Sequence, residues 1–524
     1  MLKYSNRIDL YFKIVYNKAN MESGCKRSMS DKKYISTRGQ QKPLDFYDAI
    51  LQGIGSDGGL LVPDFELEQK DLKSLQNLSY VDMATEIISS FVDENAKEEI
   101  RELCQKAYGN GLFPQEVVPV KKAGDVYIAE LFQGPTAAFK DMALSLLPHF
   151  MTYSLKKKGE ERKVMILAAT SGDTGKAALE GFKDVEGTYI QVFYPVDGVS
   201  PIQKQQMITQ TGSNVDVVGI QGNFDDAQTA VKKAFQSPDL KDLCDEHHVF
   251  LSSANSINIG RLIPQVVYYF YSYMTLVHDQ EIKLGEPVNF TIPSGNFGNC
   301  LAGVIARKMG LPITKFIVAS NKNNILTDFF RTGKYDARRD FYKTNAPAMD
   351  ILVSSNLERL VYMVSQDSQK VQTYMDNLNK QGVYEISDDL LEKLQTLFKA
   401  GWLDEDEVLS VIHTCFEETG YLLDTHTAIG YGVYKEYQKA FRDETKTIIL
   451  ATASPYKFAD SVYEALENQK LPEYEAIEAV HQKTGVPIPT PLVHLDQKEV
   501  KHHKVIHKDD IIQEISQKIK ELSL

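Results

Sequence analysis

The sequence contains few cysteines, and none of them lies in a disulfide or metal-binding pattern. Its 524 residues include five cysteines, an odd number that are far apart and form no Cys-x-x-Cys pair. This spacing argues against a disulfide framework or a zinc knuckle and fits a reducing compartment. No apolar run approaches the roughly 20 residues of a bilayer-spanning helix. Leu10–Tyr16 is too short for a signal peptide and is broken by Lys13. We therefore expect a cytoplasmic protein with no membrane segment.

The sequence also lacks an excess of positive charge. Its 58 Lys and Arg stand against 71 Asp and Glu, which gives a net charge of -13. This balance argues against nucleic acid as the main partner, although a local basic pocket for a small anion is compatible with it. The adjacent pairs His247-His248 and His502-His503 point apart on a regular element, and His149, His413 and His494 have no acidic or cysteine companions at ligand spacing, so we expect no metal. His426 lies among small and polar residues and is best interpreted as a structural histidine.

The length of the chain predicts two to four domains or subdomains of an ordinary globular protein. The first 33 residues differ from the rest, with eight Lys and Arg, three Asp and Glu and no sustained periodicity. We expect an extra N-terminal leader there, and hypothesise that 1–28 is disordered or an upstream-start artefact. The predicted division is a leader over 1–33, an N-terminal segment over 34–125, a smaller mobile α/β subdomain over 126–285, and a large α/β subdomain with a helical insertion over 286–524.

Short apolar segments alternate with helical patterns through much of the chain. This is the rhythm of βαβ units, so it predicts an α/β fold of doubly wound, mostly parallel sheets. The expected strands are Lys163–Ala168, Tyr189–Tyr194, Val215–Ile220, Pro287–Ile292, Lys315–Ala319 and Thr447–Leu450. The segment 357–440 is mostly helical in pattern.

One lysine has unusually apolar neighbours. Lys140 follows the turn Gly134-Pro135-Thr136, which we expect to open an apolar helix. A buried lysine is costly to charge, so its pKa should fall and leave some free amine, which condenses with an aldehyde to an imine. A surface lysine at the polar edge of the helix is the alternative, and it is the better explanation for a lysine considered alone.

Three predicted strands end in loops of small polar residues, where ligands bind in open α/β sheets. The first loop, Ala169–Gly175, can present backbone amides and a helix N-terminus to an anion. It is not a nucleotide P-loop, because Thr170 replaces the first glycine and Ala177 replaces the metal-binding hydroxyl. A plain strand–helix turn explains this loop equally well.

The other two loops carry more specific signals. Pro293–Asn299 places two glycines and two asparagines ahead of a helix, a set of amide donors suited to one phosphate monoester. It lacks the GxGxxG pattern, so a dinucleotide is disfavoured. The hydroxyl of Thr452 can bond an unprotonated ring nitrogen, although such residues are also common in turns.

Ser252–Arg261 is a further polar stretch ahead of an apolar helix. Arg261 is a rigid bidentate donor of the kind that binds phosphate. The alternative is a capped helix N-terminus with Arg261 paired to a surface acid.

A lysine in an apolar pocket, an amide cradle for a phosphate and a hydroxyl for a ring nitrogen together describe a pyridoxal 5′-phosphate site. The motifs resemble those of the threonine synthases, which have the tryptophan-synthase-like type II fold, from about Tyr34 to near the C-terminus. In chain order the matching motifs are Gly53–Gly55, Gly58–Leu60, Gly134–Asp141, Thr170–Gly175, Ser253–Asn258 with Arg261, Pro293–Asn299, Asn345–Asp350, His426–Ala428 and Thr452–Ala453.

The resemblance implies roles for these residues. Lys140 would be the catalytic, imine-forming lysine. The other implied contacts are Gly295, Asn296, Phe297 and Asn299 at the cofactor phosphate, Thr452 at the ring nitrogen, Ser171, Asp173 and Thr174 beside the substrate, and Asn255 and Arg261 at the substrate phosphate. The implied reaction converts O-phospho-L-homoserine and water to L-threonine and phosphate by β,γ-elimination and water addition. The implied protein is a monomer or homodimer.

Two departures and three alternatives remain. Gln133 stands where many family members have His, and Asn345–Asp350 carries extra residues. The nearest alternative function is another type II lyase, such as a threonine/serine dehydratase or a cysteine synthase, which binds no substrate phosphate. The second is a pyridoxal-phosphate-binding homologue without activity. Nucleotide binding fits least well.

Overall fold

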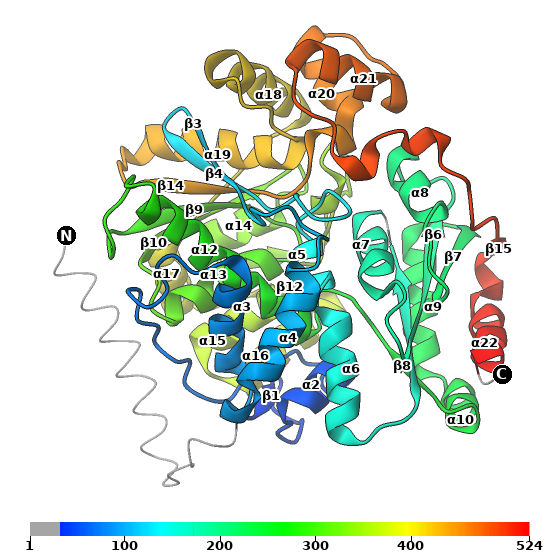
Figure 1. Cartoon of the computed structure of the whole chain (residues 1–524). Helices are drawn as coiled ribbons and strands as arrows, with labels where there is room; N and C mark the ends of the chain where they lie inside the picture. The colour runs from blue at the N-terminus through cyan, green and yellow to red at the C-terminus, as the bar shows by residue number, and fades with distance from the viewer. Residues whose placement is uncertain (1–31, 171, 523–524) are drawn as a thin grey trace, which may run out of the picture.

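The computed structural model describes residues 32–170 and 172–522, which form two large sheets and two small two-stranded sheets, with helices packed around them (Figure 1). The predicted leader lies almost entirely outside the described residues and stays a prediction. Lys32 is an exception, because its Nζ donates hydrogen bonds to Val92 O at 2.7 Å and to Ser89 O at 3.3 Å. Lys32 is therefore attached to the N-terminal segment rather than to a separate leader.

The N-terminal segment is a small α+β unit. Its two strands, β1 (Tyr34–Ser36) and β2 (Leu61–Pro63), pair antiparallel. Asp45 caps the first helix by accepting from Asp48 N, and Gly53 ends it with a φ of 72° that favours glycine. The helices are α2 (Phe46–Gln52), α3 (Tyr80–Ile88) and α4 (Lys97–Tyr108).

The larger sheet has six strands in the order β13-β10-β9-β14-β4-β3. All neighbouring strands are parallel except β3 and β4. The strands are β3 (Val120–Ala123), β4 (Val126–Glu130), β9 (Val288–Pro293), β10 (Ile313–Ser320), β13 (Phe398–Trp402) and β14 (Thr447–Ala451). Helix α19 (Thr425–Phe441) packs on one face, and α12 (Pro264–His278) and α13 (Gly298–Lys308) lie on the other (Figure 1). Since β9 and β14 are neighbours, the loops that follow them emerge side by side.

The smaller sheet has five parallel strands in the order β15-β7-β6-β5-β8. Its strands are β5 (Lys163–Ala169), β6 (Thr188–Pro195), β7 (Val215–Gln221), β8 (Val249–Ser252) and β15 (Val505–His507). The helices around it are α7 (Asp173–Phe182), α8 (Pro201–Ile208), α9 (Phe224–Gln236), α10 (Pro238–Glu246) and α22 (Ile511–Leu522). The predicted mostly parallel, doubly wound organisation is confirmed.

The boundaries of the two sheets differ from the predicted division. Strand β4 belongs to the larger sheet, although 126–285 was assigned to the smaller subdomain. Strand β15 pairs with β7, so the C-terminal end of 286–524 completes the smaller sheet. Both assignments correct the predicted division. The prediction is wrong here because pairing between strands that are distant in the chain leaves no local signal in the sequence.

The segment 357–440 is helical, as predicted, except for two short strands. Its helices are α15 (Leu357–Ser365), α16 (Ser368–Gln381), α17 (Asp388–Leu397) and α18 (Glu405–Thr419), followed by α19. The strand β12 (Val383–Glu385) pairs with β11 (Lys334–Asp336), and β13 forms the edge of the larger sheet.

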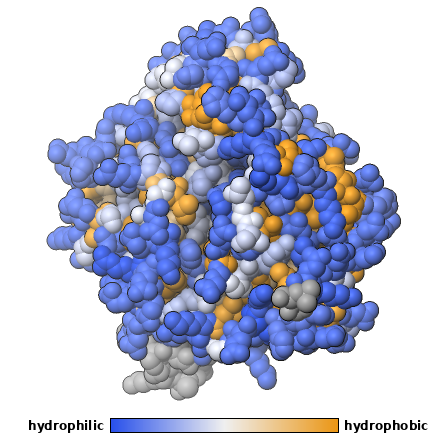
Figure 2. All heavy atoms as spheres, turned by 45° about the vertical axis from the view of Figure 1, so that its right-hand side comes forward, coloured by the Kyte–Doolittle hydropathy of each residue, from blue (hydrophilic) through white to orange (hydrophobic). Residues whose placement is uncertain are grey.

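Hydrophilic side chains dominate the face shown in Figure 2, and hydrophobic residues form small separate groups on it. In the described part of the chain, every helix is too short or too polar to cross a membrane.

Candidate active site

Lys140 immediately precedes the short helix α5 (Asp141–Leu144), and α5 lies between the two larger sheets (Figure 1). The residues before it do not form the predicted helix, because Ala137 has a φ of 58° and Ala138 makes an antiparallel bridge to Ala453. Phe139 N donates to Thr452 O at 2.8 Å. These backbone contacts hold the residues before Lys140 against the end of β14, next to Thr452.

The turn that carries Lys140 is closed by Asp141. Its two carboxylate oxygens accept from Thr136 N at 2.8 Å and from Thr136 Oγ1 at 2.6 Å. Burial raises the pKa of Asp141 to about 6, although the hydrogen bonds from Thr136 oppose the rise. A Cβ on Gly134 would lie 2.6 Å from Asp141 Cβ and 2.8 Å from Phe113 Cε1, so only glycine fits there.

The amine of Lys140 lies in an environment that disfavours its charge. Its side chain is 12% exposed, and its Nζ is 3.5 Å from Asp173 Oδ2. Burial lowers the pKa of Lys140, Asp173 opposes that shift, and the positive charges of Lys457 and Arg261 reinforce it. The prediction of a lysine with a lowered pKa agrees with this geometry.

Asp173 is the centre of the charge cluster. Its Oδ1 is 2.7 Å from Lys457 Nζ and accepts from Gln203 Nε2 at 2.9 Å. Burial alone would raise the pKa of Asp173, but Lys457 and Lys140 outweigh burial and hold it well below its usual range. Asp173 is therefore a carboxylate at neutral pH.

Sequence reasoning missed Lys457. This residue lies in the short helix η4 (Pro455–Phe458) directly after β14, and its side chain is fully buried. The signal that singled out Lys140 was also present here, because Lys457 stands between Tyr456 and Phe458 beside a strand end that we expected to face a ligand.

The loop after β9, which we predict to be an amide cradle, leads directly into α13. Phe297 has a φ of 63°, and α13 begins at the next residue. Within 32–170 and 172–522, no group accepts a hydrogen bond from the backbone N–H of Gly295, Asn296 or Phe297. These donors and the N-terminus of an 11-residue helix can all serve one anion.

Neighbouring side chains fix the shape of this cradle. Ser294 Oγ donates to Asn299 Oδ1 at 2.7 Å, and Asn299 Nδ2 donates to Pro293 O at 2.9 Å. A Cβ on Gly295 would lie 3.0 Å from Ala348 O, so the segment 345–350 presses against the loop. The Asn299 side chain therefore stabilises the loop through its contacts with Pro293 and Ser294.

Arg261 lies on helix α11 (Ile259–Leu262), which contacts both α5 and α13. Its guanidinium is buried, with Nη1 donating to Ala254 O at 2.8 Å and Nε lacking any hydrogen-bond partner in the described chain. Burial lowers the pKa of Arg261 to about 10, so it is still a cation at neutral pH. Asn258 caps α11 by accepting from Gly260 N, as the alternative interpretation expects, but Arg261 makes no ion pair with an acid in the described chain.

One residue that the sequence analysis does not single out, Asn356, connects the polar stretch before Arg261 to the amide cradle. Asn356 Nδ2 donates to both Ser256 O and Asn296 O at 3.1 Å. Gln265 Nε2 donates to Arg261 O at 2.7 Å and lies near Gly298. Lys140, Asp173, Thr452, Arg261 and the cradle are thus parts of one site.

The remaining predicted contacts are less closely integrated. Asn255 is exposed, and its Oδ1 accepts from Ile257 N at 3.1 Å, which leaves its amide group free to donate. Thr174 is half-buried on the first turn of α7. Ser171 lies outside the described residues.

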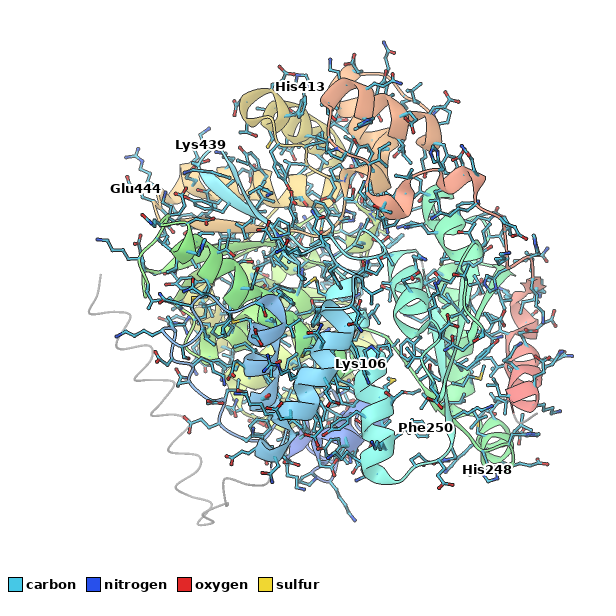
Figure 3. The ribbon with its side chains drawn as sticks, viewed as in Figure 1. Lys106, His248, Phe250, His413, Lys439 and Glu444 are labelled. Atoms are coloured by element: carbon cyan, nitrogen blue, oxygen red, sulfur yellow. The ribbon has the colours of Figure 1, made fainter. Side chains whose placement is uncertain are left out.

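His426 is a structural histidine, as interpreted from the sequence. Its Nε2 accepts from Ala348 N at 3.1 Å, so its Nδ1 carries the proton and donates to Asp424 Oδ1 at 3.0 Å. In Figure 3, His413 lies at the top of the molecule and His248 at the lower right. In the described residues, no three His, Cys, Asp or Glu side chains are arranged to hold a metal ion.

Gln133, the residue that departs from the family pattern, is hydrogen-bonded to Glu130. Its Nε2 donates to Glu130 Oε2 at 2.7 Å, and Tyr421 OH donates to the other oxygen of Glu130 at 2.8 Å. The departure at this position is therefore accommodated by a carboxylate next to the turn.

The donor set fits pyridoxal 5′-phosphate, the cofactor that the resemblance implies. The cofactor needs an amine for its aldehyde, a set of N–H donors for its phosphate and a polar partner for its ring nitrogen. Lys140, the cradle at 295–297 and the strand-end residue Thr452 meet these needs at the same edge of the larger sheet.

Comparisons with known proteins place the chain among pyridoxal-phosphate-dependent enzymes. Three family models match the chain: "Threonine synthase N terminus" over 33–108, "Pyridoxal-phosphate dependent enzyme" over 113–453 and "Threonine synthase, C-terminal" over 427–515. The match to the first begins at residue 33, inside the predicted leader.

Curated relatives carry two kinds of name. The chain is 40% identical to Threonine synthase-like 1 of Homo sapiens, over 82% of this chain and 59% of that protein. It is 37% identical to Threonine synthase of Pseudomonas aeruginosa, over 83% of this chain and 90% of that protein. The chain thus spans less than two thirds of the human relative but most of the bacterial one.

Solved structures show the same fold. A pyridoxal-phosphate-bound threonine synthase from Brucella melitensis has a TM-score of 0.82 and 36% identity, covering 94% of this chain and 99% of that one. Threonine synthase from yeast has a TM-score of 0.84 and 32% identity, covering 95% and 99%. The fold is that of the type II pyridoxal-phosphate enzymes. The chain therefore belongs to the threonine synthase family of pyridoxal-phosphate-dependent enzymes, and its cofactor is pyridoxal 5′-phosphate.

Proposed function

We propose that the protein is a threonine synthase, which converts O-phospho-L-homoserine and water to L-threonine and phosphate. The observation that carries this proposal is the buried guanidinium of Arg261, whose Nε lacks a hydrogen-bond partner in the described chain and whose charge acts on Lys140. A buried cation with a free donor favours an anionic ligand. A dehydratase substrate has no phosphate to fill this role, so Arg261 favours a phosphorylated substrate.

Pyridoxal 5′-phosphate, when bound, supplies an aldehyde for the substrate amine and a ring that spreads negative charge from the substrate carbons. In our proposal the amine of Lys140 holds the cofactor and then moves protons at the α and β carbons of the substrate. Its lowered pKa suits a group that must be a free base near neutral pH. The proton transfers precede loss of phosphate from the γ carbon and addition of water at the β carbon.

The remaining assignments concern the cofactor phosphate and the ring nitrogen. We assign Gly295, Asn296 and Phe297 to the cofactor phosphate through their backbone N–H groups, and Thr452 to the ring nitrogen. We also assign Asn299 to the cofactor phosphate, because its hydrogen bonds to Ser294 and Pro293 use only one of the two N–H donors of its Nδ2.

At the substrate, Arg261 and the free amide group of Asn255 would hold the phosphate by charge-assisted and neutral hydrogen bonds. The loop with Ser171, Asp173 and Thr174 would border the rest of the substrate. A cytoplasmic location and a monomer or homodimer complete the proposal, and size-exclusion chromatography with light scattering tests the latter.

The test of this function measures two products at once. Purified protein is incubated with pyridoxal 5′-phosphate and O-phospho-L-homoserine, and phosphate and threonine are quantified together. We expect equal amounts of both. Phosphate without threonine would contradict the water-addition step, and cofactor binding without either product would identify an inactive homologue. Keto acid and ammonia formed from threonine or serine would identify a dehydratase.

A further inference from the structure

Lys457 is the most completely buried charged group near Lys140, and the proposed chemistry leaves it without a role. Its Nζ is 2.7 Å from Asp173 Oδ1 and donates to Thr136 O at 3.1 Å. Its side chain has no exposed surface. It therefore connects the end of β14, the first turn of α7 and the turn that carries Lys140.

Burying an ammonium group is costly unless its partners are well placed. An apolar side chain of similar length would fill this space without that cost. A purely structural link between η4 and the Thr136 turn could also be made by a neutral donor. Packing alone therefore does not explain why a charged residue stands at this position. The short distance between Lys457 and Asp173 offers an explanation.

Asp173 is shared unequally between two lysines. Lys457 holds one oxygen at 2.7 Å, and Lys140 approaches the other only to 3.5 Å. Gln203 Nε2 donates to the same oxygen as Lys457, at 2.9 Å. The carboxylate is therefore paired to Lys457 and Gln203 and makes only a long contact with Lys140.

We propose that Lys457 is a positioning residue of the active site, which neutralises Asp173 and so leaves the amine of Lys140 free to react with the cofactor. Asp173 and Lys457 form an internal ion pair, and Lys140 has no counterion of its own among the described residues. This inference rests on the assignment of Lys140 as the cofactor lysine.

The charges that face Lys140 come from three other elements. Asp173 on α7 is the only one of them that favours the ammonium form, while Lys457 on η4 and Arg261 on α11 disfavour it. Asp141, on the same turn as Lys140, is turned toward Thr136 and is itself influenced by Lys457. Removing Lys457 would remove one repelling cation and release Asp173 to pair with Lys140.

The test follows the pH dependence of cofactor association. The full chain is dialysed against pyridoxal 5′-phosphate from pH 5.5 to 9.5, and bound cofactor is measured. Association that depends on the lysine requires a free amine, so its low-pH midpoint reports the protonation of that amine. The titrations of the cofactor itself are the same for every variant. We expect Lys457→Met to raise the midpoint by about one pH unit or more, which is a tenfold loss of free amine below the midpoint. An unchanged midpoint would overturn the inference.

A second pair of variants separates this role from a loss of structure. Asp173→Asn should leave the midpoint unchanged or lower it, because it removes the group that favours the ammonium form. The double variant Lys457→Met with Asp173→Asn should return the midpoint to within about half a unit of the parent. A purely structural role predicts that the double variant is no better than Lys457→Met alone, and that result would contradict the proposal.

Two further variants distinguish failure of this inference from failure of the proposed function. Lys140→Ala should abolish the pH-dependent association, and if it does not, the lysine assignment itself is wrong. Lys176→Met removes another buried lysine, which pairs with Glu180 rather than with Asp173. It should leave the midpoint unmoved, and a rise equal to that of Lys457→Met would show that any buried lysine has this effect.

Discussion

Lys140 and Lys176 are both buried lysines near the start of a helix, yet their surroundings differ in one respect. Lys176 Nζ is 2.8 Å from Glu180 Oε2, one turn along the same helix, and it also donates to Gln210. Lys140 reaches only a carboxylate that is already paired with Lys457. Burial lowers the pKa of both lysines. Burial alone therefore does not distinguish the two lysines, and we propose that the lack of a dedicated counterion marks Lys140 as the reactive one.

The strongest test of this difference is to remove Lys140. Lys140→Ala eliminates the proposed base and the attachment to the cofactor, so we expect turnover of O-phospho-L-homoserine to fall by roughly 10²–10⁴-fold or more. The visible absorbance of the cofactor–lysine linkage should disappear as well. Steady-state assays and absorbance spectra measure both effects. A variant that retains the absorbance band would show that another lysine binds the cofactor.

The location of this lysine was predictable from the sequence, but its local structure was not. The apolar residues around Lys140 and the small polar residues at 293–299 are local signals, and the site that we propose is built from them. The backbone at Ala137 depends on pairing with Ala453, which is distant in the sequence. That contact replaces the expected helix with an irregular turn, a case of tertiary pairing overriding local propensity.

The same limit explains the missing parts of the site and of the sheets. The ion pair between Lys457 and Asp173 joins residues from two elements that only the fold brings together. Strand β15 has three residues, and β13 includes Lys399 and Gly401, so neither carries the apolar run that marks a buried strand. The parallel strands that the sequence predicts are recognisable because each has an apolar run and a polar loop within a few residues.

The next largest effect should come from Arg261. Arg261→Ala removes the buried cation that we assign to the substrate phosphate, and we expect kcat/KM for O-phospho-L-homoserine to fall by roughly 10²–10³-fold. Arg261→Lys should recover only part of this loss, because it keeps the charge without the two-pronged donor.

A surface arginine provides the matched control for this variant. Arg101 is more than half exposed and pairs with Asp82, so Arg101→Ala should leave turnover within about twofold. Cofactor absorbance should be unchanged in both Arg261 variants. If Arg261→Ala retains full activity, the substrate phosphate must be bound elsewhere.

A smaller effect is expected at the amide cradle. A Cβ at Gly295 would lie 3.0 Å from Ala348 O and 3.2 Å from Met349 Cα, both of them backbone atoms. Gly295→Ala should therefore shift the loop by a few tenths of an ångström and weaken cofactor binding by about tenfold, or 1.4 kcal/mol. Equilibrium dialysis measures this change.

Gly285 offers a control for the cradle variant, because a Cβ there meets nothing within 4 Å. Its φ of 85° still makes Gly285→Ala somewhat destabilising, but cofactor affinity should not change. Equal losses of affinity in the two variants would indicate a general loss of stability rather than a local effect on the cradle.

The smallest effect on function should come from Lys176, the structural member of the comparison. Lys176→Met leaves Glu180 without its partner, but the Glu180 side chain is 20% exposed and can be hydrated in part. We expect turnover to stay within about twofold and the free energy of unfolding to fall by about 1 kcal/mol, as measured by urea denaturation. A tenfold loss of turnover in a folded variant would place Lys176 in the site and remove the distinction between the two lysines.

The loss of stability in Lys176→Met should depend on pH, and the pKa of Glu180 determines the direction of that dependence. In the parent, burial raises the pKa of Glu180, but Lys176 outweighs burial and lowers it. Without Lys176 the pKa of Glu180 in the folded state should rise, so the folded protein binds a proton more readily and becomes relatively more stable as the pH falls. The stability difference between parent and Lys176→Met should therefore shrink from pH 7 to pH 5. Adding Glu180→Gln should recover part of the loss at pH 7, because the unpaired buried carboxylate is then gone. If the loss instead grows as the pH falls, Glu180 is not the group that Lys176 stabilises.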